Sequence, residues 1–423
     1  MLALLAPRGA LQEGAELPVL RTETRALDYQ IGGAWRLGAW HVTPELALDV
    51  LSLPRSAGPQ RVVFRSPVDE LVLEVAPGED RDFLVRLAGV GDCRTRLSAL
   101  RRSAERVRED GQPFVTLPFT LEGDDRLYVQ GTLDGSEPLR LMFDTGSNQL
   151  VLFREGRAKL PELRFDGTAD NQAAGGLVST PTSDGHRLEL GDLRWNHERV
   201  VFFDQDPGYD GILGYDLFTD RVLEIDPEAG ELRIHESLPA SALCAEALEL
   251  RWEGNLSALP VRLEAGGEPI EAWPILDSGA TTGLALGAGF AGRNGLPGSL
   301  RALGSSRSSG LGPRPIEATV VEVPLLRLGP CALENVPVHV GRDTASDHVA
   351  EGLLGMDVLK RFQLWIDYPR NEVHLRPNAL AGRPFRRDYD TGRWRGVLGG
   401  GVALAGVALG LFLVRRRRLR RGA

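Results

Sequence analysis

Two short motifs in the sequence combine an apolar stretch with an aspartate, a hydroxyl residue and a glycine. Residues 142–147 read Met-Phe-Asp-Thr-Gly-Ser, and residues 275–280 read Ile-Leu-Asp-Ser-Gly-Ala. An apolar strand that runs into an aspartate holds the carboxylate at the end of a rigid element. The neighbouring hydroxyl can donate a hydrogen bond, and glycine lets backbone and solvent come close. The motifs therefore predict positioned carboxylates at Asp144 and Asp277.

Two such carboxylates can perform acid–base chemistry if the fold brings them together. Like charges at hydrogen-bonding distance do not both ionise readily, so one proton is shared and the pair titrates as a unit. Such a pair can deprotonate a water and protonate a leaving group at one site. A third match, Asp390-Thr391-Gly392, follows Arg386-Arg-Asp-Tyr rather than an apolar strand, so we interpret it as a turn.

The two motifs belong to an internal repeat that extends from about residue 112 to residue 377. After each motif comes an apolar-apolar-glycine element, within residues 210–218 and 351–359, and then a closing strand that ends in aspartate, residues 222–226 and 363–367. The offset between the copies is 133 residues at the motifs (277 − 144) and 141 residues at the later elements (351 − 210). This order of matches predicts two related β lobes.

The repeated pattern resembles the signature of the aspartic proteases: apolar-apolar-Asp-[Ser/Thr]-Gly-[Ala/Ser], followed later by apolar-apolar-Gly. The chain is similar to retropepsin-like and pepsin-like enzymes, with both lobes fused in one chain. The resemblance implies a mainly β, bilobal fold whose lobes are the first repeat, residues 112–238, and the second repeat, residues 245–377. It implies a catalytic dyad of Asp144 and Asp277. The implied supporting residues are Thr145, Gly146, Ser147, Ser278 and Gly279.

The two lobes are not equivalent, and the chain departs from the pepsin-like pattern at its flap. Ser147 could hydrogen-bond the outer oxygen of Asp144, whereas Ala280 has no hydroxyl for Asp277. Pepsin-like enzymes carry a tyrosine on a flap in the first lobe, but no tyrosine lies between Asp144 and Tyr209. The Gly- and Ser-rich stretches of the two repeats, residues 173–180 and 303–312, are therefore candidate flaps. One flap in each lobe suits a retropepsin-like arrangement.

The resemblance implies an aspartic endopeptidase that hydrolyses a polypeptide substrate with a water activated between the two aspartates, without cofactor or metal. One alternative is a catalytically silent peptide-binding module of the same fold. The presence of both aspartates and both hydroxyl neighbours counts against it, and the missing flap tyrosine counts for it. Another alternative is a surface interaction protein led by the N-terminal region, which no specific feature favours.

The composition excludes other classes of protein. The chain has 423 residues, 42% hydrophobic and 25% charged, and its 50 glycines and 27 prolines favour many turns and β structure. The net charge is −9, and six arginines lie in the last nine residues, so the rest carries −15, which argues against a nucleic-acid partner. Neither lysine follows a glycine, which excludes a phosphate-binding loop. Cys-x-x-Cys, His-Glu-x-x-His and Gly-x-Ser-x-Gly motifs do not occur.

Further segments flank the repeats. Residues 22–99 contain short β-rich runs and predict a small β-sandwich-like domain. Residues 100–111 are a linker, and the Arg- and Glu-rich stretch 97–110 predicts that it is helical. Residues 378–396 are a second linker, which leads to an apolar run.

The apolar run, residues 397–414, holds 18 residues without a charge. At about 1.5 Å per residue it reaches about 27 Å, which predicts a transmembrane helix. Six arginines in the tail, residues 415–423, against Arg393 and Arg395 before the run, predict a cytoplasmic tail. The protease domain would then be extracytoplasmic, periplasmic or at the surface of a bacterial cell.

We expect a monomer that is anchored in the membrane by this helix. Gly406 and Gly410 offer a weak small-xxx-small signal for a helix-mediated dimer. The run and its arginines also resemble bacterial C-terminal sorting tails, in which case the mature enzyme loses the anchor. Residues 1–6 are too short for the apolar core of a signal peptide, so the sequence leaves open where an export signal would lie.

Overall fold

The structure, a computed structural model, describes residues 17–390 except residues 32, 40–48, 57, 100–102, 108–111, 122, 124, 245, 254, 299, 343–350 and 388. In these ranges the chain is mainly β with few, short helices, which confirms the predicted class. The chain divides into two compact units. The first comprises residues 1–169, 181–259 and 362–376, and the second comprises residues 170–180, 260–361 and 377–423.

The predicted transmembrane segment, residues 397–414, lies outside the described residues. Among the residues that are described, none of the helices is long and apolar enough to cross a membrane. The membrane anchor therefore stays a prediction.

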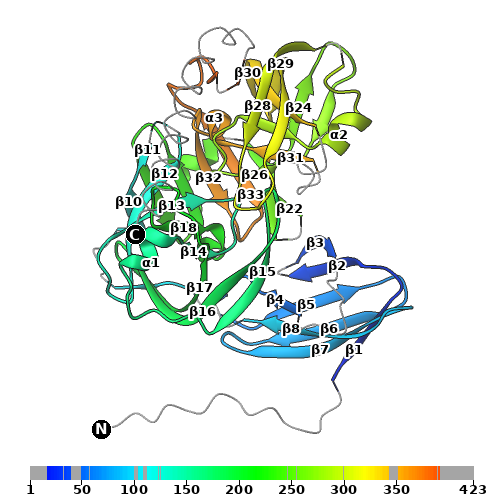
Figure 1. The fold of residues 1–423 in the computed structure, drawn as a ribbon, viewed down its shortest axis with the longest axis vertical. Coiled ribbons are helices and arrows are strands. Elements are labelled where there is room, and N and C mark those ends of the chain that lie inside the picture. Colours follow the sequence, from blue (N-terminus) through cyan, green and yellow to red (C-terminus); the bar gives the residue numbers. More distant parts are fainter. Residues whose placement is uncertain are drawn as a thin grey trace, which may run out of the picture. The chain divides into compact units, whose positions relative to one another are not determined.

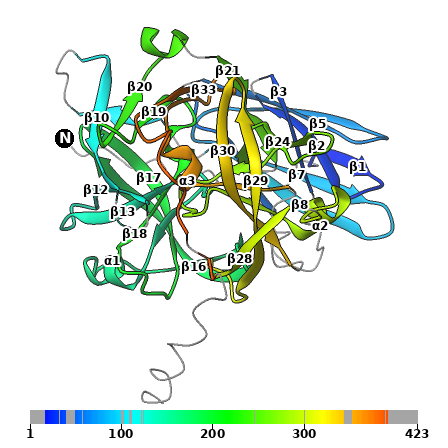
Figure 2. The same ribbon diagram turned by 90° about the horizontal axis from the view of Figure 1, so that it is seen from above.

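The N-terminal β domain, drawn in blue shades in Figures 1 and 2, consists of two groups of paired strands around one core. One group has the order β1-β7-β8-β4 and the other the order β3-β2-β5-β6. Side chains alternate along each strand, so Leu27, Tyr29 and Ile31 of β2 are all buried. Between the groups, the rings of Phe64 and Phe83 stack with centroids 5.0 Å apart. The strands are β1 (Val19–Thr22), β2 (Ala26–Ile31), β3 (Ala34–Ala39), β4 (Asp49–Ser52), β5 (Gln60–Arg65), β6 (Glu70–Val75), β7 (Asp80–Leu87) and β8 (Gly91–Ser98).

The segment that follows this domain is extended where the structure describes it. β9 (Glu105–Arg106) pairs antiparallel with β17 (Leu193–Phe202). The prediction of a helix is therefore wrong for residues 97–99 and 103–107, the part of the stretch 97–110 that the structure describes. Ion pairs between exposed side chains stabilise a helix by only about 0.3–0.5 kcal/mol each. The edge of β17 offers backbone hydrogen-bond partners instead.

In the first repeat, the strand that ends in the first motif, β13, belongs to a sheet with both parallel and antiparallel pairings. β13 pairs in parallel with β18, and β14 lies antiparallel to β18 and parallel to β17. β12 pairs antiparallel with β13, and β16 with β17. The elements are β10 (Phe114–Pro118), β11 (Thr120–Leu121), β12 (Leu127–Leu133), β13 (Leu139–Asp144), β14 (Leu150–Leu152), α1 (Arg154–Ala158), β15 (Gly167–Ala173), β16 (Gly176–Leu190), β17, β18 (Gly211–Gly214), η1 (Tyr215–Phe218), β19 (Val222–Asp226) and β20 (Glu231–His235).

The second repeat has the same pairing around the second motif. β26 pairs in parallel with β31, and β27 lies antiparallel to β31 and parallel to β30. β24 pairs antiparallel with β25, and β29 with β30, the two long strands drawn in yellow in Figure 2. The elements are η2 (Ala240–Cys244), β21 (Ala247–Glu249), β22 (Arg251–Glu253), β23 (Leu256–Ala258), β24 (Val261–Glu264), β25 (Ile270–Ala272), β26 (Ile275–Leu276), β27 (Leu284–Leu286), α2 (Ala288–Arg293), β28 (Arg301–Ser308), β29 (Ile316–Leu328), β30 (Cys331–Gly341), β31 (Gly352–Leu354), α3 (Met356–Leu359), β32 (Phe362–Asp367) and β33 (Glu372–Pro377).

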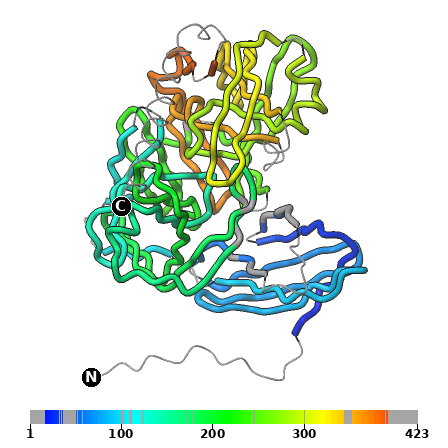
Figure 3. Tube along the Cα trace, in the orientation of Figure 1, coloured from blue at the N-terminus to red at the C-terminus, as the bar shows by residue number. Residues whose placement is uncertain are grey.

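The closing strands of both repeats meet in one sheet of the first unit, with the order β10-β20-β19-β32-β33-β21. β32 and β33 belong to the part of the chain drawn in orange in Figure 3. β19 and β32 pair antiparallel in its middle, and Glu224 lies opposite Trp365. These two positions are equivalent in the repeat, since 365 − 224 = 141. The pair of strands is therefore symmetric about this point, and all six residues of β32 are buried.

Candidate active site

Asp144 is the last residue of β13, a strand whose side chains Leu141 and Phe143 are fully buried. The parallel partner β18 puts Gly214 opposite Asp144. The amide of Gly146 donates a hydrogen bond to Oδ1 of Asp144 at 2.8 Å. A backbone N–H that donates to a carboxylate favours the ionised form and fixes its orientation.

Asp277 directly follows β26 and is held in a similar way. Its own amide donates to the carbonyl oxygen of Leu354 in β31 at 3.0 Å. The amide of Ala280 donates to Oδ1 of Asp277 at 2.8 Å. In the second motif this donor is the third residue after the aspartate, whereas in the first motif Gly146 is the second residue after it. Both carboxylates lie in loops that a neighbouring parallel strand supports.

The glycines of the two apolar-apolar-glycine elements pack directly behind these loops. A Cβ atom on Gly214 would lie 2.6 Å from the carbonyl oxygen of Ser147 and would also clash with the backbone of Gln149. A Cβ atom on Gly355 would lie 2.8 Å from the carbonyl oxygen of Ala280 and would clash with the carbonyl oxygen of Thr282. Glycine therefore permits the close packing of backbone at both positions.

The predicted supporting residues are divided between the two units. Thr145, Gly146 and Ser147 lie with Asp144 in the first unit. Ser278 and Gly279 lie with Asp277 in the second unit. Thr145 and Ser278 are each 1% exposed, so both hydroxyls lie beneath the surface.

Ser147 is engaged within its own turn. Its Oγ lies 3.5 Å from the carbonyl oxygen of Gln149, and the amide of Gln149 lies 3.4 Å from that Oγ. The expected contact between Ser147 and Asp144 stays a prediction, as does the pairing of Asp144 with Asp277.

An aromatic cluster behind the first motif was not predicted from the sequence. The ring centroids of Tyr215, Trp252 and Tyr368 lie 5.5–6.2 Å apart. The amide of Tyr215 donates to the carbonyl oxygen of Ser147 at 2.8 Å, which joins the cluster to the Asp144 loop. Burial first, and then neighbouring negative charges including that of Asp144, raise the pKa of Tyr368 well above its ordinary value. The feature of the sequence that could have indicated this cluster is the position of its two tyrosines. Tyr215 directly follows the apolar-apolar-glycine element, and Tyr368 directly follows the second closing strand.

Both candidate flaps are hairpin tips that contact each other in the second unit. The amide of Gly312 donates to the carbonyl oxygen of Ala174 at 2.9 Å, and that of Arg314 to the carbonyl oxygen of Gly175 at 3.1 Å. Gly175 has φ +96°, and a Cβ atom there would clash with the carbonyl oxygen of Arg314. Glycine therefore permits this backbone contact between β15–β16 and β28–β29.

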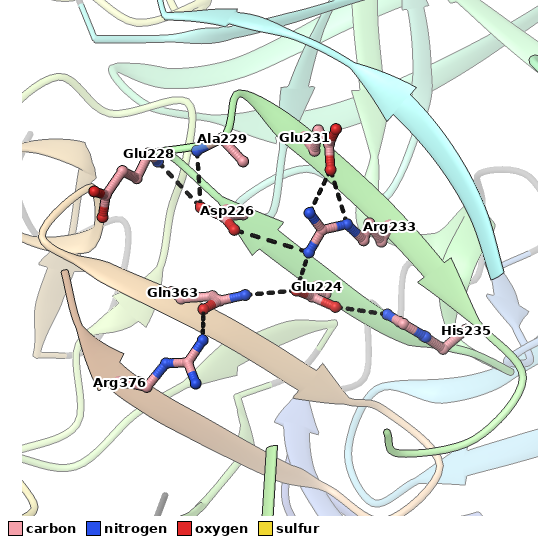
Figure 4. A network of polar contacts seen from close by, with 9 residues as sticks. All are labelled: Glu224, Asp226, Glu228, Ala229, Glu231, Arg233, His235, Gln363 and Arg376. Atoms are coloured by element: carbon pink, nitrogen blue, oxygen red, sulfur yellow. Dashed lines mark hydrogen bonds and ion pairs between the residues drawn. The ribbon is translucent and has the colours of Figure 1, made fainter. Parts of the chain in front are cut away.

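A buried polar network crosses the pair of closing strands (Figure 4). Glu224, 3% exposed, accepts hydrogen bonds from His235 at 2.7 Å, from Arg233 at 2.5 Å and from Gln363 at 2.6 Å. Burial alone would raise the pKa of Glu224, but the hydrogen bond from His235 and the charge of Arg233 outweigh it and lower the pKa. Glu224 is therefore ionised in the folded protein down to acidic pH.

Two surface hollows were considered as alternative sites. One, of about 770 Å³, is lined by Arg140, Lys159 and Asp210 among others, and Lys159 Nζ lies 2.6 Å from Asp210 Oδ2. The other, of about 630 Å³, lies beside Arg55 and Asp220. Neither hollow is lined by an aspartate of the two motifs.

Comparison with known proteins identifies the repeated motif. The family model for aspartyl proteases matches residues 129–217 and 260–358, one segment in each repeat. A search of curated proteins gives no match to the chain. The two matched segments contain Asp144 and Asp277 with their neighbours, and they support an aspartic-protease-like domain and a general peptidase function.

Proposed function

We propose that the chain is an aspartic endopeptidase in which Asp144 and Asp277 act as one catalytic dyad. The observation that carries this proposal is the repetition of one arrangement: a buried strand, an aspartate with a backbone N–H donor, and a glycine of a parallel strand packed behind it. Each occurrence lies in a segment that matches the aspartyl protease family.

The symmetry of the closing strands supports a bilobal, retropepsin-like arrangement. Because equivalent positions face each other at Glu224 and Trp365, a local twofold axis relates the two closing strands. If the same axis relates the rest of the repeats, equivalent loops face each other across it. The Asp144 and Asp277 loops would be one such pair, and the two hairpin tips another.

The dyad would work with a single proton. The ionised carboxylate takes a proton from a water as the water oxygen bonds to the scissile carbonyl carbon, while the protonated carboxyl donates its proton to the carbonyl oxygen. The C–N bond of the tetrahedral intermediate then breaks: the leaving nitrogen takes the proton of the protonated carboxyl, and a hydroxyl of the intermediate gives its proton to the ionised carboxylate. The products are a carboxylic acid and an amine, and the dyad again holds one proton. Thr145 and Ser278, both buried, would hold the loops beneath the carboxylates.

The substrate class that suits this site is an extended polypeptide. Extended chains bind between β elements by backbone hydrogen bonds, and pockets for alternate side chains give specificity. Two hairpins that meet at their tips would cover such a chain.

Incubation of the purified full chain with a peptide library between about pH 3 and pH 8 tests this function, with cleavage products identified by mass spectrometry. We expect a bell-shaped pH profile on the acidic side of neutral, since the dyad must hold one proton. Pepstatin should inhibit, whereas chelators and serine reagents should not. Absence of cleavage over the whole range would favour the silent peptide-binding module.

The cellular location is a separate proposal, which rests on the sequence. The apolar run at residues 397–414 would anchor the chain with its arginine-rich tail in the cytoplasm and its protease domain outside. Protease added to cells with a permeabilised outer layer should digest the body and leave a tag after Ala423 protected. Exposure of the tag with protection of the body would overturn this topology.

A further inference from the structure

Arg55 extends from the N-terminal β domain into the first repeat. It is 3% exposed, and its Nη1 and Nη2 donate to the two carboxylate oxygens of Glu198 in β17, each at 2.7 Å. Its Nη2 also lies 3.3 Å from Oδ2 of Asp216, and its Nε donates to the carbonyl oxygen of Asp216 at 2.8 Å. The backbone amide of Arg55 donates to Oγ1 of Thr219 at 3.1 Å. One arginine of another domain thus holds β17 and helix η1 together.

Helix η1 lies directly behind the Asp144 loop. It begins at Tyr215, immediately after Gly214, which pairs with Asp144. The amide of Tyr215 donates to the carbonyl oxygen of Ser147 at 2.8 Å. Arg55 is therefore connected to the Asp144 loop through Asp216 and its neighbour in the chain, Tyr215.

Two of these contacts, both to the aspartate of the helix, recur within the second repeat. Asp357 of α3 is the counterpart of Asp216, since 357 − 216 = 141. Arg361, on the turn that follows, donates from Nε to the carbonyl oxygen of Asp357 at 2.7 Å, and its Nη2 lies 3.4 Å from Oδ1 of Asp357. These are the same two nitrogen atoms on the same two acceptor groups as in the first repeat.

The first repeat has no arginine of its own for this role. The position equivalent to Arg361 is 361 − 141 = 220, and residue 220 is an aspartate. The guanidinium group of Arg55 makes the contacts that an arginine at position 220 would make. A carboxylate at residue 220 makes an arginine from elsewhere in the chain necessary.

We propose that the N-terminal β domain completes the first repeat by supplying Arg55, which acts as a positioning residue for the Asp144 loop. The catalytic part of this statement rests on the function proposed above, and the positioning part does not. Loss of the guanidinium leaves Glu198 and Asp216 as two buried carboxylates without their shared cation. Uncompensated buried charges are strongly unfavourable, so η1 should separate from β17 and the Asp144 loop should lose its support.

Hydrogen exchange in the full chain separates positioning from general stability. In Arg55→Met, which keeps most of the side-chain volume, we expect at least tenfold faster amide exchange in the peptides that cover residues 144–149 and 211–218. The peptides that cover residues 277–282 and 352–359 should keep wild-type rates and serve as internal controls. In Arg361→Met the pattern should be reversed. Arg65→Met, a change at an exposed arginine of the same domain, should leave all four peptides unchanged.

Two results would overturn the proposal: wild-type exchange at residues 144–149 and 211–218 in Arg55→Met, or equal acceleration in both repeats of a folded variant. If Arg55→Met does not fold, the same criteria apply to Arg55→Lys. Lysine keeps the charge but cannot engage Glu198 and the Asp216 carbonyl oxygen together, and at least threefold faster exchange is expected.

Peptide cleavage then reports on catalysis. Arg55→Met should lower kcat about 10- to 100-fold and leave KM within about twofold, because Arg55 contacts β17 and η1 rather than substrate. A change confined to KM would contradict a positioning role. If wild type does not cleave peptides at all, the proposed function fails, while the exchange pattern still decides whether Arg55 positions the loop.

Discussion

In both repeats an arginine contacts the aspartate of the helix behind the motif loop, but the two arginines come from different places. In the first repeat Arg55 of the N-terminal β domain reaches Asp216. In the second repeat Arg361 reaches Asp357 within four residues, and its Nη1 also lies 3.1 Å from the carbonyl oxygen of Leu380. The segment after the second repeat is fixed in turn by this cluster.

The difference indicates how the duplicated structure has diverged. The features next to the reacting groups are alike: aspartate, hydroxyl residue and glycine in both loops, and a glycine behind each. The supports farther back differ, since one helix depends on a preceding domain and the other on its own following turn. The first repeat should therefore be the one whose geometry responds to changes outside the protease region.

The largest expected effect comes from removing either motif carboxylate. Asp144→Asn, Asp277→Asn and the double variant should each lower kcat by about 10³–10⁴, and by similar factors, because one carboxylate cannot act as both acid and base. Initial rates of peptide cleavage at the pH optimum measure this. The matched control is Asp390→Asn, which should keep wild-type activity. Near-normal activity in either single variant would show that the repeats do not contribute equally.

The next effect concerns the two glycines behind the loops. Gly214→Ala and Gly355→Ala each put a methyl group into neighbouring backbone, and each should lower the free energy of unfolding by about 2–4 kcal/mol. Thermal unfolding followed by circular dichroism measures the loss. Gly267→Ala is the control, because a Cβ atom there has no atom within 4 Å. A loss in only one of the two variants would mean that the loops are packed differently.

A smaller effect is expected at Glu224, in the sheet that joins the repeats. Glu224→Gln should lower the free energy of unfolding by about 1–3 kcal/mol at pH 7. Because the folded-state pKa of Glu224 is lowered, its stabilisation is complete above the unfolded pKa of about 4.3 and is lost as the pH falls through the folded pKa. The difference between wild type and variant should therefore shrink only below about pH 4.

Glu231→Gln provides the matched control for that series. Glu231 contacts the same Arg233, but its side chain is 36% exposed. The change should lower the free energy of unfolding by less than about 1 kcal/mol at any pH. Equal effects of the two substitutions would contradict a special role for the buried carboxylate.

The smallest effect is expected where the loops differ in sequence. Ser147→Ala makes the first loop resemble the second, and Ala280→Ser does the reverse. Because the Ser147 hydroxyl contacts the backbone of Gln149, we expect less than about threefold change in kcat/KM from either. A larger loss in Ser147→Ala alone, with a shifted pH profile, would show that Ser147 hydrogen-bonds the outer oxygen of Asp144.

Local patterns were sufficient to predict the elements that carry the motifs. The apolar residues before Asp144 and Asp277 do form strands that end at or just before the aspartates. Asp226 and Asp367, which end the two closing strands, accept backbone N–H bonds from Ala229 at 3.0 Å and Arg370 at 3.0 Å. These features depend on neighbours in the sequence, which the pattern contains.

Features that depend on distant partners were not predicted. The stretch at residues 97–110 has the charges of a helix, but β9 pairs with β17, about 90 residues away in sequence. Arg55 carries no local signal, because its partner Glu198 is 143 residues away in sequence. The aromatic cluster likewise joins three segments that no motif connects. Only the folded chain brings such groups together.

The distance between the carboxylates of Asp144 and Asp277 tests the central claim most directly. A crystal structure of the full chain with a bound pepstatin-like inhibitor would give this distance and the position of the inhibitor hydroxyl. We expect one inhibitor per chain, with its hydroxyl between the two carboxylates. The nearest oxygen of each carboxylate should lie about 2.6–3.2 Å from the oxygen of that hydroxyl. Carboxylates too far apart for both to contact that hydroxyl would contradict a shared proton and the proposed function.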